Sequence, residues 1–387
     1  MRKLLVIAVA VALASLAAAD LRAEEGSELE ISGNVTTLTG WQRPSKNPNL
    51  GADGILNDAL AAPGELTTDT FGFFIDQVEL DLAKSFGENI RIRADLDFSP
   101  HRINAGGGQV EIEQGYVTAN IPAGNGIEFL MGRFNSGVGL DPIDRNELST
   151  ASFSTVHRTL LPHNITGIRF GYDFSEATRF ELYVVNNLNG DVADPGTSED
   201  TDIPSGGFNL SYMWGDEGNK SWLKFNGAIG PEGPTKKGYS FLGDLNGNFA
   251  VSDAFWIGAE GVYRQDDGGL IGAENAQYIG GQLKGRYAFS DVWDGTLRYS
   301  FVWDLDQGQA GGIPAGGLVP ANPDGAIGIG SGLGAAGTMH TITLATGYQI
   351  TDGARFIIEG GVDLSRPSTG GGTGFTPGVA GMFAYSF

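Results

Sequence analysis

Charged side chains are frequent in the segment 136–164. Their types suit electrostatic interaction with a solute better than covalent catalysis. The group consists of Asp141, Asp144, Glu147, Arg145 and Arg158, with Arg133 and Arg169 in the flanking segments. Carboxylates that face arginines across water set up a transverse field, which sorts small solutes by charge and size. We therefore predict that this segment lies inside a water-filled passage and narrows it. The alternative is a segment that caps the passage or lies outside it.

Residues suited to covalent catalysis are sparse. The chain has no Cys, which excludes disulfides, thiolate nucleophiles and cysteine zinc sites. Its four histidines are His101, His157, His163 and His340. His340 alternates in phase with Ile342 and Leu344 and could face lipid, but a phospholipase-like site would need a serine partner that the sequence does not identify. We predict no catalytic residues and keep an outer-membrane enzyme as the less favoured alternative.

Two further patterns resemble ligand sites only formally. The segment 188–205 is rich in carboxylates but lacks the spacing of a calcium loop, which favours a solvated acidic loop. Residues 332–337 spell G-x-G-x-x-G without the strand–turn–helix context of a dinucleotide site. We therefore predict neither a metal nor a cofactor. The formal net charge of -22 also makes nucleic acid an unsuitable partner.

The N-terminus has the pattern of an export signal. Arg2 and Lys3 precede an apolar stretch over residues 4–16, and the run Ala17 to Ala19 fits a small-residue cleavage site. We predict a signal peptide over residues 1–19, with cleavage after Ala23 as the alternative. An uncleaved anchor helix is less favoured, because a membrane span needs about 20 apolar residues. Since no other run is long enough, a membrane location would require a closed β-barrel.

The elements that must position these residues are strands, because polar and apolar residues alternate with a period of two. In residues 90–98, for example, apolar side chains alternate with Arg91, Arg93, Asp95 and Asp97. Applied along the chain, the pattern predicts strands near 28–41, 71–83, 89–99, 109–120, 127–135, 165–174, 178–187, 206–215, 221–230, 238–250, 254–264, 277–289, 293–305, 338–349, 353–365 and 377–387. About sixteen segments of roughly ten residues are typical of bacterial outer-membrane barrels.

The gaps between these segments alternate between short and long. Short gaps carry turn residues, such as Gly87-Glu88 and Asp352-Gly353, whereas long gaps span 42–70, 136–164, 188–205 and 306–337. A soluble sandwich would also alternate in polarity, but nothing in it would enforce short turns on one side and long loops on the other. We therefore predict short periplasmic turns and long extracellular loops, with both termini in the periplasm.

The polar side chains of the alternating segments share one face. They include Arg91, Arg93, Asp95, Asp97, Glu111, Glu113, Lys224, Asn226, Glu260, Lys284, Arg286, Arg298, Arg355, Glu359 and Asp363. A barrel of about sixteen strands is too wide to be filled by its own side chains. Charges of both signs on its inner face therefore predict an aqueous lumen, in which some of them form structural ion pairs.

Aromatic residues mark the ends of the predicted strands. Phe383, Tyr385 and Phe387 alternate up to the last residue, like the terminal strand that the barrel assembly machinery recognises in outer-membrane proteins. An ordinary edge strand is the alternative. Further aromatics near strand ends fit an interfacial girdle, namely Trp214, Tyr263, Tyr287, Trp303 and Tyr348.

Three short motifs resemble the OmpL-like outer-membrane β-barrel porin family. They are Gly132-Arg133-Phe134-Asn135 at a strand end, residues 161–169 (LPHNITGIR) entering the next strand, and residues 184–187 (VVNN). The last motif departs from the Asn-Gly that usually follows the paired valines in the family. The resemblance is strongest over residues 70–265. It implies an outer-membrane channel and no catalytic residues.

Together these features predict an all-β protein, with a single transmembrane antiparallel barrel of about 16 strands over residues 28–387. We predict a porin for passive diffusion of small hydrophilic solutes, with a mild cation preference because the chain is acidic. Its expected lining is Arg91, Arg93, Asp95, Glu111, Glu113, Arg133, Asp141, Asp144, Glu147 and Arg169. A substrate-specific porin and a plugged structural barrel remain alternatives. Expected partners are outer-membrane lipid and lipopolysaccharide, the barrel assembly machinery and a homotrimer, although no residue pattern specifies the trimer.

Overall fold

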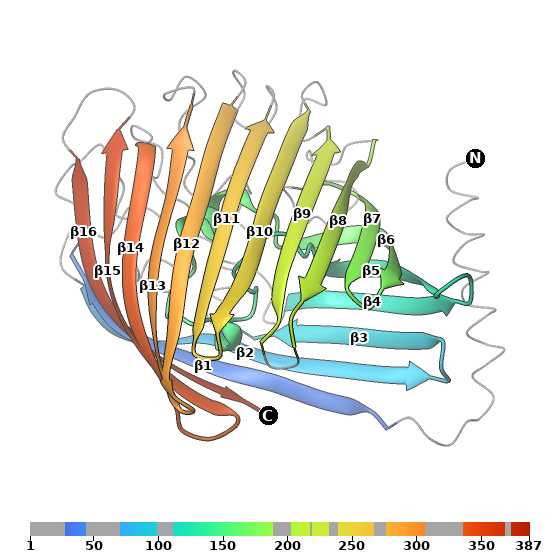
Figure 1. Cartoon of the computed structure of the whole chain (residues 1–387), viewed down its shortest axis with the longest axis horizontal. Helices are drawn as coiled ribbons and strands as arrows, with labels where there is room; N and C mark the ends of the chain where they lie inside the picture. The colour runs from blue at the N-terminus through green and yellow to red at the C-terminus, as the bar shows by residue number, and fades with distance from the viewer. Residues whose placement is uncertain are drawn as a thin grey trace.

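Sixteen antiparallel strands close into one barrel in the described part of the chain (Figure 1). The computed structural model describes residues 28–43, 70–98, 111–188, 203–216, 219–231, 239–266, 276–305, 336–367 and 373–387. Each strand pairs with its neighbours in sequence, and the first strand pairs with the last, so that no edge is left open. The predicted fold class is therefore confirmed. The predicted signal peptide lies outside the described residues.

The strand bounds agree closely with those predicted from alternation. The strands are β1 (Glu30–Gln42), β2 (Thr70–Phe86), β3 (Ile90–Asp97), β4 (Glu111–Ile121), β5 (Ile127–Asn135), β6 (Asn164–Ser175), β7 (Thr178–Val185), β8 (Ser205–Trp214), β9 (Ser221–Gly230), β10 (Ser240–Ser252), β11 (Phe255–Asp266), β12 (Ala276–Ser290), β13 (Trp293–Asp304), β14 (Ala336–Gln349), β15 (Ala354–Pro367) and β16 (Gly374–Ser386). Two helical pieces, η1 (Arg145–Glu147) and α4 (Thr155–Leu160), lie between β5 and β6. In the described residues, no helix is long and apolar enough to cross a membrane.

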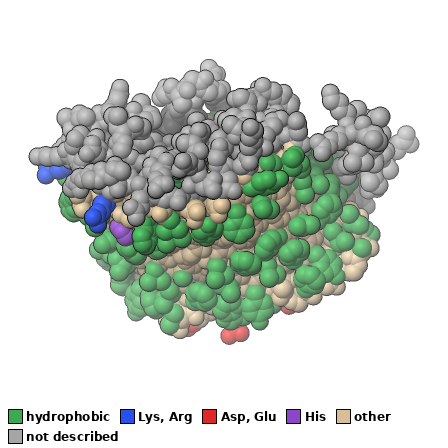
Figure 2. Space-filling model, turned by 90° about the horizontal axis from the view of Figure 1, so that it is seen from above, with side chains coloured by type: hydrophobic (Ala, Val, Ile, Leu, Met, Phe, Trp, Pro, Cys, Tyr) green, Lys and Arg blue, Asp and Glu red, His purple; other side chains and the backbone are tan. Residues whose placement is uncertain are grey.

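The two faces of the wall differ as the alternation predicts. In β13, Leu297 and Tyr299 are exposed on the outside, whereas Arg298 and Ser300 are completely buried on the inside. The same contrast repeats around the barrel, and Figure 2 shows the resulting apolar coat on its outer surface. An apolar outer surface is stable in hydrocarbon, whereas the inner surface carries the polar groups.

Short turns gather at one end of the barrel. Turns of two to four residues join β2 to β3, β6 to β7, β10 to β11, β12 to β13 and β14 to β15. Because neighbouring strands are antiparallel, all of these turns lie at the same end of the barrel, as the sequence predicts for the periplasmic turns. Gly87, in the turn between β2 and β3, has a φ of 62°, a conformation that glycine adopts without steric cost.

Two β-bulges add polar side chains to the inner face near β1–β4. The register of β2 against β1 shifts at Asp76, and that of β4 against β3 shifts at Glu113. A bulge places two residues of one strand opposite one residue of its partner. As a result, the neighbours Asp76 and Gln77 are both buried, and so are Glu113 and Gln114. Strict alternation would have turned one residue of each pair toward lipid.

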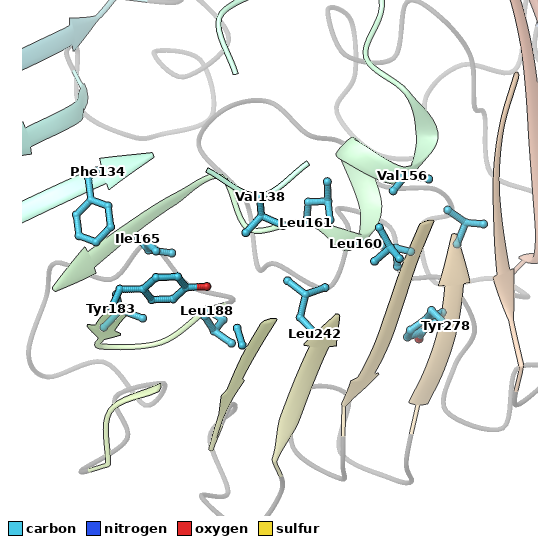
Figure 3. Packing of buried hydrophobic residues seen from close by; sticks show 14 of the residues in the cluster. Phe134, Val138, Val156, Leu160, Leu161, Ile165, Tyr183, Leu188, Leu242 and Tyr278 are labelled. Carbon is cyan, nitrogen blue, oxygen red and sulfur yellow. The ribbon is translucent and has the colours of Figure 1, made fainter. Parts of the chain in front are cut away.

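The connection between β5 and β6, residues 136–163, folds into the barrel. Helix α4 contacts β11, β12, β13 and β14, whereas η1 contacts β1 and β16. Apolar side chains of this connection pack against the wall. Val138, Val156 and Leu160 belong to one buried cluster with Leu242 and Tyr278 of the wall (Figure 3). Burial of apolar side chains on both partners stabilises the connection against the wall. We call residues 136–163 the inner loop.

Candidate functional site

One attachment of the inner loop is built around a completely buried arginine of β13. Arg298 donates from Nη1 to Thr150 Oγ1 (2.9 Å) and to the Ser152 carbonyl (2.7 Å), and from Nη2 to Ser152 Oγ (2.8 Å). Glu359 of β15 accepts from the backbone N–H of Ala151 (2.7 Å) and of Ser152 (3.1 Å). Charged hydrogen bonds of this kind are stronger than neutral ones. We call Arg298, Glu359 and residues 150–153 the Arg298 anchor.

Asp141 adds a carboxylate from the inner loop to this region. Its Oδ1 lies 3.0 Å from Lys284 Nζ, and its Oδ2 lies 3.8 Å from Arg298 Nη1. The backbone N–H of Ser154 donates to Oδ2 at 2.9 Å. Burial alone would raise the pKa of Asp141, but Lys284 and Arg298 outweigh it and hold that pKa well below its usual range. Asp141 is therefore a fixed negative charge between two wall cations.

Several wall side chains bind the backbone of the inner loop directly. Asp244 of β10 accepts from Gly139 N–H (3.1 Å), and Glu260 of β11 accepts from Leu140 N–H (3.0 Å). Arg264 of β11 donates to the Leu160 carbonyl (2.8 Å). Since the wall supplies partners from successive strands, the inner loop is held across the lumen at many points. These bonds satisfy backbone groups that burial would otherwise leave without partners.

A second, neighbouring attachment lies beside β1, β2 and β16 and is built around a cation of the inner loop, Arg145, which also donates from Nη1 to the Ala151 carbonyl (3.1 Å). Arg145 Nε lies 2.6 Å from Asp76 Oδ2, and its guanidinium lies 4.5 Å from the Phe153 ring centroid. The backbone N–H of Arg145 donates to Gln77 Oε1 at 3.3 Å. We call Arg145, Asp76, Gln77 and the adjacent Asp144 the Arg145 anchor.

Carboxylates crowd around the Arg145 anchor. Oxygens of Glu79, Glu113 and Asp144 lie within 4.8 Å of one another, and so do those of Glu79, Asp81 and Asp95. We call these five residues the acidic cluster. Burial raises the pKa of Asp144 to about 7, and the neighbouring carboxylates of Glu147, Asp81 and Asp95 contribute to that rise. Carboxylates at this spacing can share a proton or a hard cation.

Most of the remaining predicted lining residues are on the inner face but pair along the wall. Arg93 Nε lies 2.7 Å from Asp95 Oδ1, and the half-exposed Arg91 lies 2.6 Å from Glu30. Glu113 is buried at the bulge of β4. The side chain of Glu111 lies outside the described residues.

The structure corrects the expectation for Arg133. The register places it opposite Gly115 and Thr166, on the face of β5 that points away from the lumen. Its neighbour Phe134 is completely buried on the inside, next to Ile165. Leu130 and Phe134 make the inner face of β5 apolar, so that alternation does not reveal which side of this strand faces water.

Arg169 does face inward, but it does not meet the carboxylates of the inner loop. It lies 3.1 Å from Glu128 and 3.6 Å from Glu181, and its guanidinium lies 5.4 Å from the Phe134 ring centroid. The predicted pairing of loop carboxylates with Arg133 and Arg169 is therefore wrong. Lys284 and Arg298, from strands far along the chain, take that role for Asp141.

A recess of about 240 Å³ remains between the inner loop and the wall. Its lining consists of Leu140, Glu147 and Ser149 from the inner loop, and of Trp222, Asn248, Trp256, Gly258, Lys284 and Arg286 from β9 to β12. Neither tryptophan was predicted from the sequence to line the lumen. Trp222 alternates in phase with the polar Lys224 and Asn226, which is the signal that would have placed it inside.

On the outer face, the C-terminal aromatics and His340 lie where lipid would meet them. Phe383, Tyr385 and Phe387 are all exposed there. His340 Nδ1 lies 2.7 Å from the Tyr299 hydroxyl. Among the hydrogen bonds of the described residues, the partner of His340 is thus a tyrosine and not the serine that a hydrolase would need.

Comparisons with known proteins agree with this architecture. A family model described as "Putative beta-barrel porin-2, OmpL-like" matches residues 29–383. No curated protein matches the chain in sequence. The outer-membrane channel DcaP of Acinetobacter baumannii is similar in structure, with a TM-score of 0.63 and 16% identity over 95% of this chain and 99% of that one.

Two further solved structures share the fold. The anion-selective porin from Comamonas acidovorans has a TM-score of 0.62 and 12% identity, covering 94% of this chain and 100% of its own. The trimer form of OmpT, an outer-membrane protein of Vibrio cholerae, has a TM-score of 0.54 and 9% identity, with coverage of 94% and 100%. At these identities the likeness concerns the fold alone.

Proposed function

Because this chain belongs to the OmpL-like β-barrel porin-2 family of the bacterial outer membrane, we propose that it forms a passive channel for small hydrophilic solutes and ions. The observation that carries the proposal is the charged inner face of a closed sixteen-strand barrel, crossed by a loop that is bound to the wall. A barrel of this width normally leaves an aqueous lumen, and charges of both signs are tolerated next to water.

In this proposal the inner loop is the constriction. The Arg298 anchor and the adjacent Arg145 anchor fix its position against the wall from β13 and β15 and from β2. In this proposal a solute passes between the wall strands that carry Lys284 and Arg298, which hold the inner loop, and the strands that carry the acidic cluster. Fixed charges at a narrow passage filter solutes by sign and size.

We further propose a mild preference for cations. The acidic cluster brings several carboxylates close to Arg145 and Arg93, and the whole chain carries a formal net charge of -22. A negative potential in the lumen raises the local concentration of cations. The anion selectivity of the Comamonas porin is a property of that protein, and the 12% identity does not transfer it to this chain.

The experiment that tests both proposals is recording from the refolded protein in planar lipid bilayers. We expect discrete, ohmic current steps, and a reversal potential in a KCl gradient whose sign corresponds to potassium permeation. Absence of steps with correctly folded protein would contradict the channel. Steps with a reversal potential of the opposite sign would leave the channel intact and overturn the cation preference.

A further inference from the structure

Two tryptophans face the lumen although the membrane does not require them there. Trp222 of β9 and Trp256 of β11 are half-buried and alternate in phase with inward-facing residues. By contrast, Trp214, Trp293 and Trp303 are exposed on the outer face. Outward tryptophans are explained by the interfacial girdle of a membrane barrel. Indoles on the aqueous side need another reason.

The two indoles belong to one recess. In the strand register Trp222 lies opposite Asn248, and Trp256 lies opposite Arg286. Strand spacing and rise per residue place the two tryptophan Cα atoms roughly 12 Å apart, with β10 between them. Lys224 Nζ lies 5.0 Å from the Trp222 ring centroid, and Arg286 Cζ lies 6.0 Å from that of Trp256. These cation–π contacts favour one orientation of each ring.

Charges at the recess are balanced in sign. Lys284 is paired with Asp141 at 3.0 Å, and Arg286 is paired with Asp294 at 3.0 Å. The exposed carboxylate of Glu147 comes from the inner loop on the other side. An anion would meet this carboxylate, and a cation would meet the two wall cations. The lining therefore favours a neutral solute.

The polar groups of the recess suit a solute that both donates and accepts hydrogen bonds. Asn248 offers an amide, Arg286 and Lys284 offer donors, and Glu147 offers acceptors. The volume of about 240 Å³ is below the roughly 300–1,000 Å³ of sites for drug-sized ligands. A small polyhydroxylated molecule with one apolar face matches both the hydrogen-bonding groups and the indoles.

We propose that the recess is a binding subsite for a neutral, monosaccharide-sized pyranose sugar. The proposal rests on the proposed channel function and names a solute class for it. The C–H groups on one face of a pyranose are slightly positive and pack against the negative face of an indole. Its hydroxyls replace water at Asn248, Arg286 and Glu147. Binding of this kind must stay weak, because a permeating solute also has to leave.

Glucose is the probe for the test, and the full-length mature protein in planar bilayers is the sample. We expect the ionic current of the wild type to fall with glucose concentration and to saturate. Trp222→Leu and Trp256→Leu should each raise the half-saturating concentration by about tenfold, as expected for loss of one aromatic contact. Trp303→Leu, which removes an outward tryptophan, is the matched control and should bind glucose like the wild type.

A second measurement separates this proposal from the channel itself. Glucose binding to the refolded protein in detergent should change its tryptophan emission, and the Trp222→Leu/Trp256→Leu double variant should lose that change. A saturable emission change in a protein that conducts no current would support the subsite and contradict the channel. Conductance with neither saturation nor an emission change would overturn the subsite alone. Saturable block by benzoate but not by glucose would overturn the neutral sugar in favour of an aromatic anion.

Discussion

The two anchors of the inner loop differ in which partner supplies the buried cation. The wall supplies Arg298 at one, and the inner loop supplies Arg145 at the other. At the Arg298 anchor, a buried guanidinium and a buried carboxylate each hold several partners in residues 150–153. At the Arg145 anchor, one cation lies among several carboxylates, and burial together with like charges raises the pKa of Asp144 to about 7. The comparison teaches that one attachment of the constriction is held by satisfied charges, whereas the attachment next to it carries electrostatic repulsion that depends on pH.

The largest expected effect is at the Arg298 anchor. In Arg298→Met, Glu359 and the Ser152 carbonyl lose the cation that offsets their desolvation. Removing one partner of a buried charged network costs about 3–5 kcal/mol. We expect that loss in the free energy of unfolding, measured by urea titration in lipid vesicles, together with a larger and noisier single-channel conductance as residues 150–153 leave the wall.

The same substitution at an exposed pair is the control. Arg91 is 43% exposed and contacts Glu30, which is 56% exposed. Since exposed ion pairs contribute about 0–1 kcal/mol, Arg91→Met should change neither stability nor conductance appreciably. Equal losses in the free energy of unfolding for the two variants would contradict a stabilising role of the Arg298 anchor beyond that of an exposed ion pair.

A smaller loss is expected for Glu359→Gln. The amide keeps the shape of the side chain but cannot accept from Ala151 N–H, Ser152 N–H and Ser152 Oγ together, as the carboxylate does. Loss of charged hydrogen bonds of this kind costs about 1–3 kcal/mol. Because Glu359 and Arg298 belong to one network, the double variant with Arg298→Met should lose less stability than the sum of the two single losses. Additive losses would contradict the shared network.

The smallest effect has the opposite sign and concerns Asp144→Asn. A carboxyl whose pKa is raised on folding contributes stability at low pH and loses it as the pH rises from about 4 to about 7. The variant has no such loss. It should therefore match the wild type below about pH 4 and exceed its free energy of unfolding by on the order of 1 kcal/mol at about pH 8. A destabilised variant at high pH would show that the Asp144 charge is favourable where it lies.

The wall of the barrel could be predicted from the sequence because its physics is local. Lipid on one side and polar groups on the other impose a period of two, and that period alone places Arg91, Arg93 and Asp95 on the inside. The period fails where other forces act on a strand. Leu130 and Phe134 pack on the inner loop side, so the alternation of β5 does not show that Arg133 points away from the lumen.

The partners of the inner loop could not be predicted in the same way. Asp141 meets Lys284, which is 143 positions away, and Ala151 meets Glu359, which is 208 positions away. Such pairings depend on how the whole barrel closes and leave no periodic trace in the sequence. The bulges that bring Asp76 and Glu113 inward are likewise single-residue departures from regular pairing. The fold and the side of the wall on which most side chains lie were therefore predictable, whereas the charge partners across the lumen were not.

The pairing of β1 with β16 has a consequence for how the molecule is made. It joins Thr37 to Phe383, 346 positions apart. Without this pairing, β1 and β16 would each leave an unpaired strand edge. Hydrocarbon offers no hydrogen-bond partner to unpaired backbone groups, so a partly formed barrel is not stable in the bilayer. Insertion and closure must therefore occur as one cooperative event, and the pairing of the first strand with the last sets its pace.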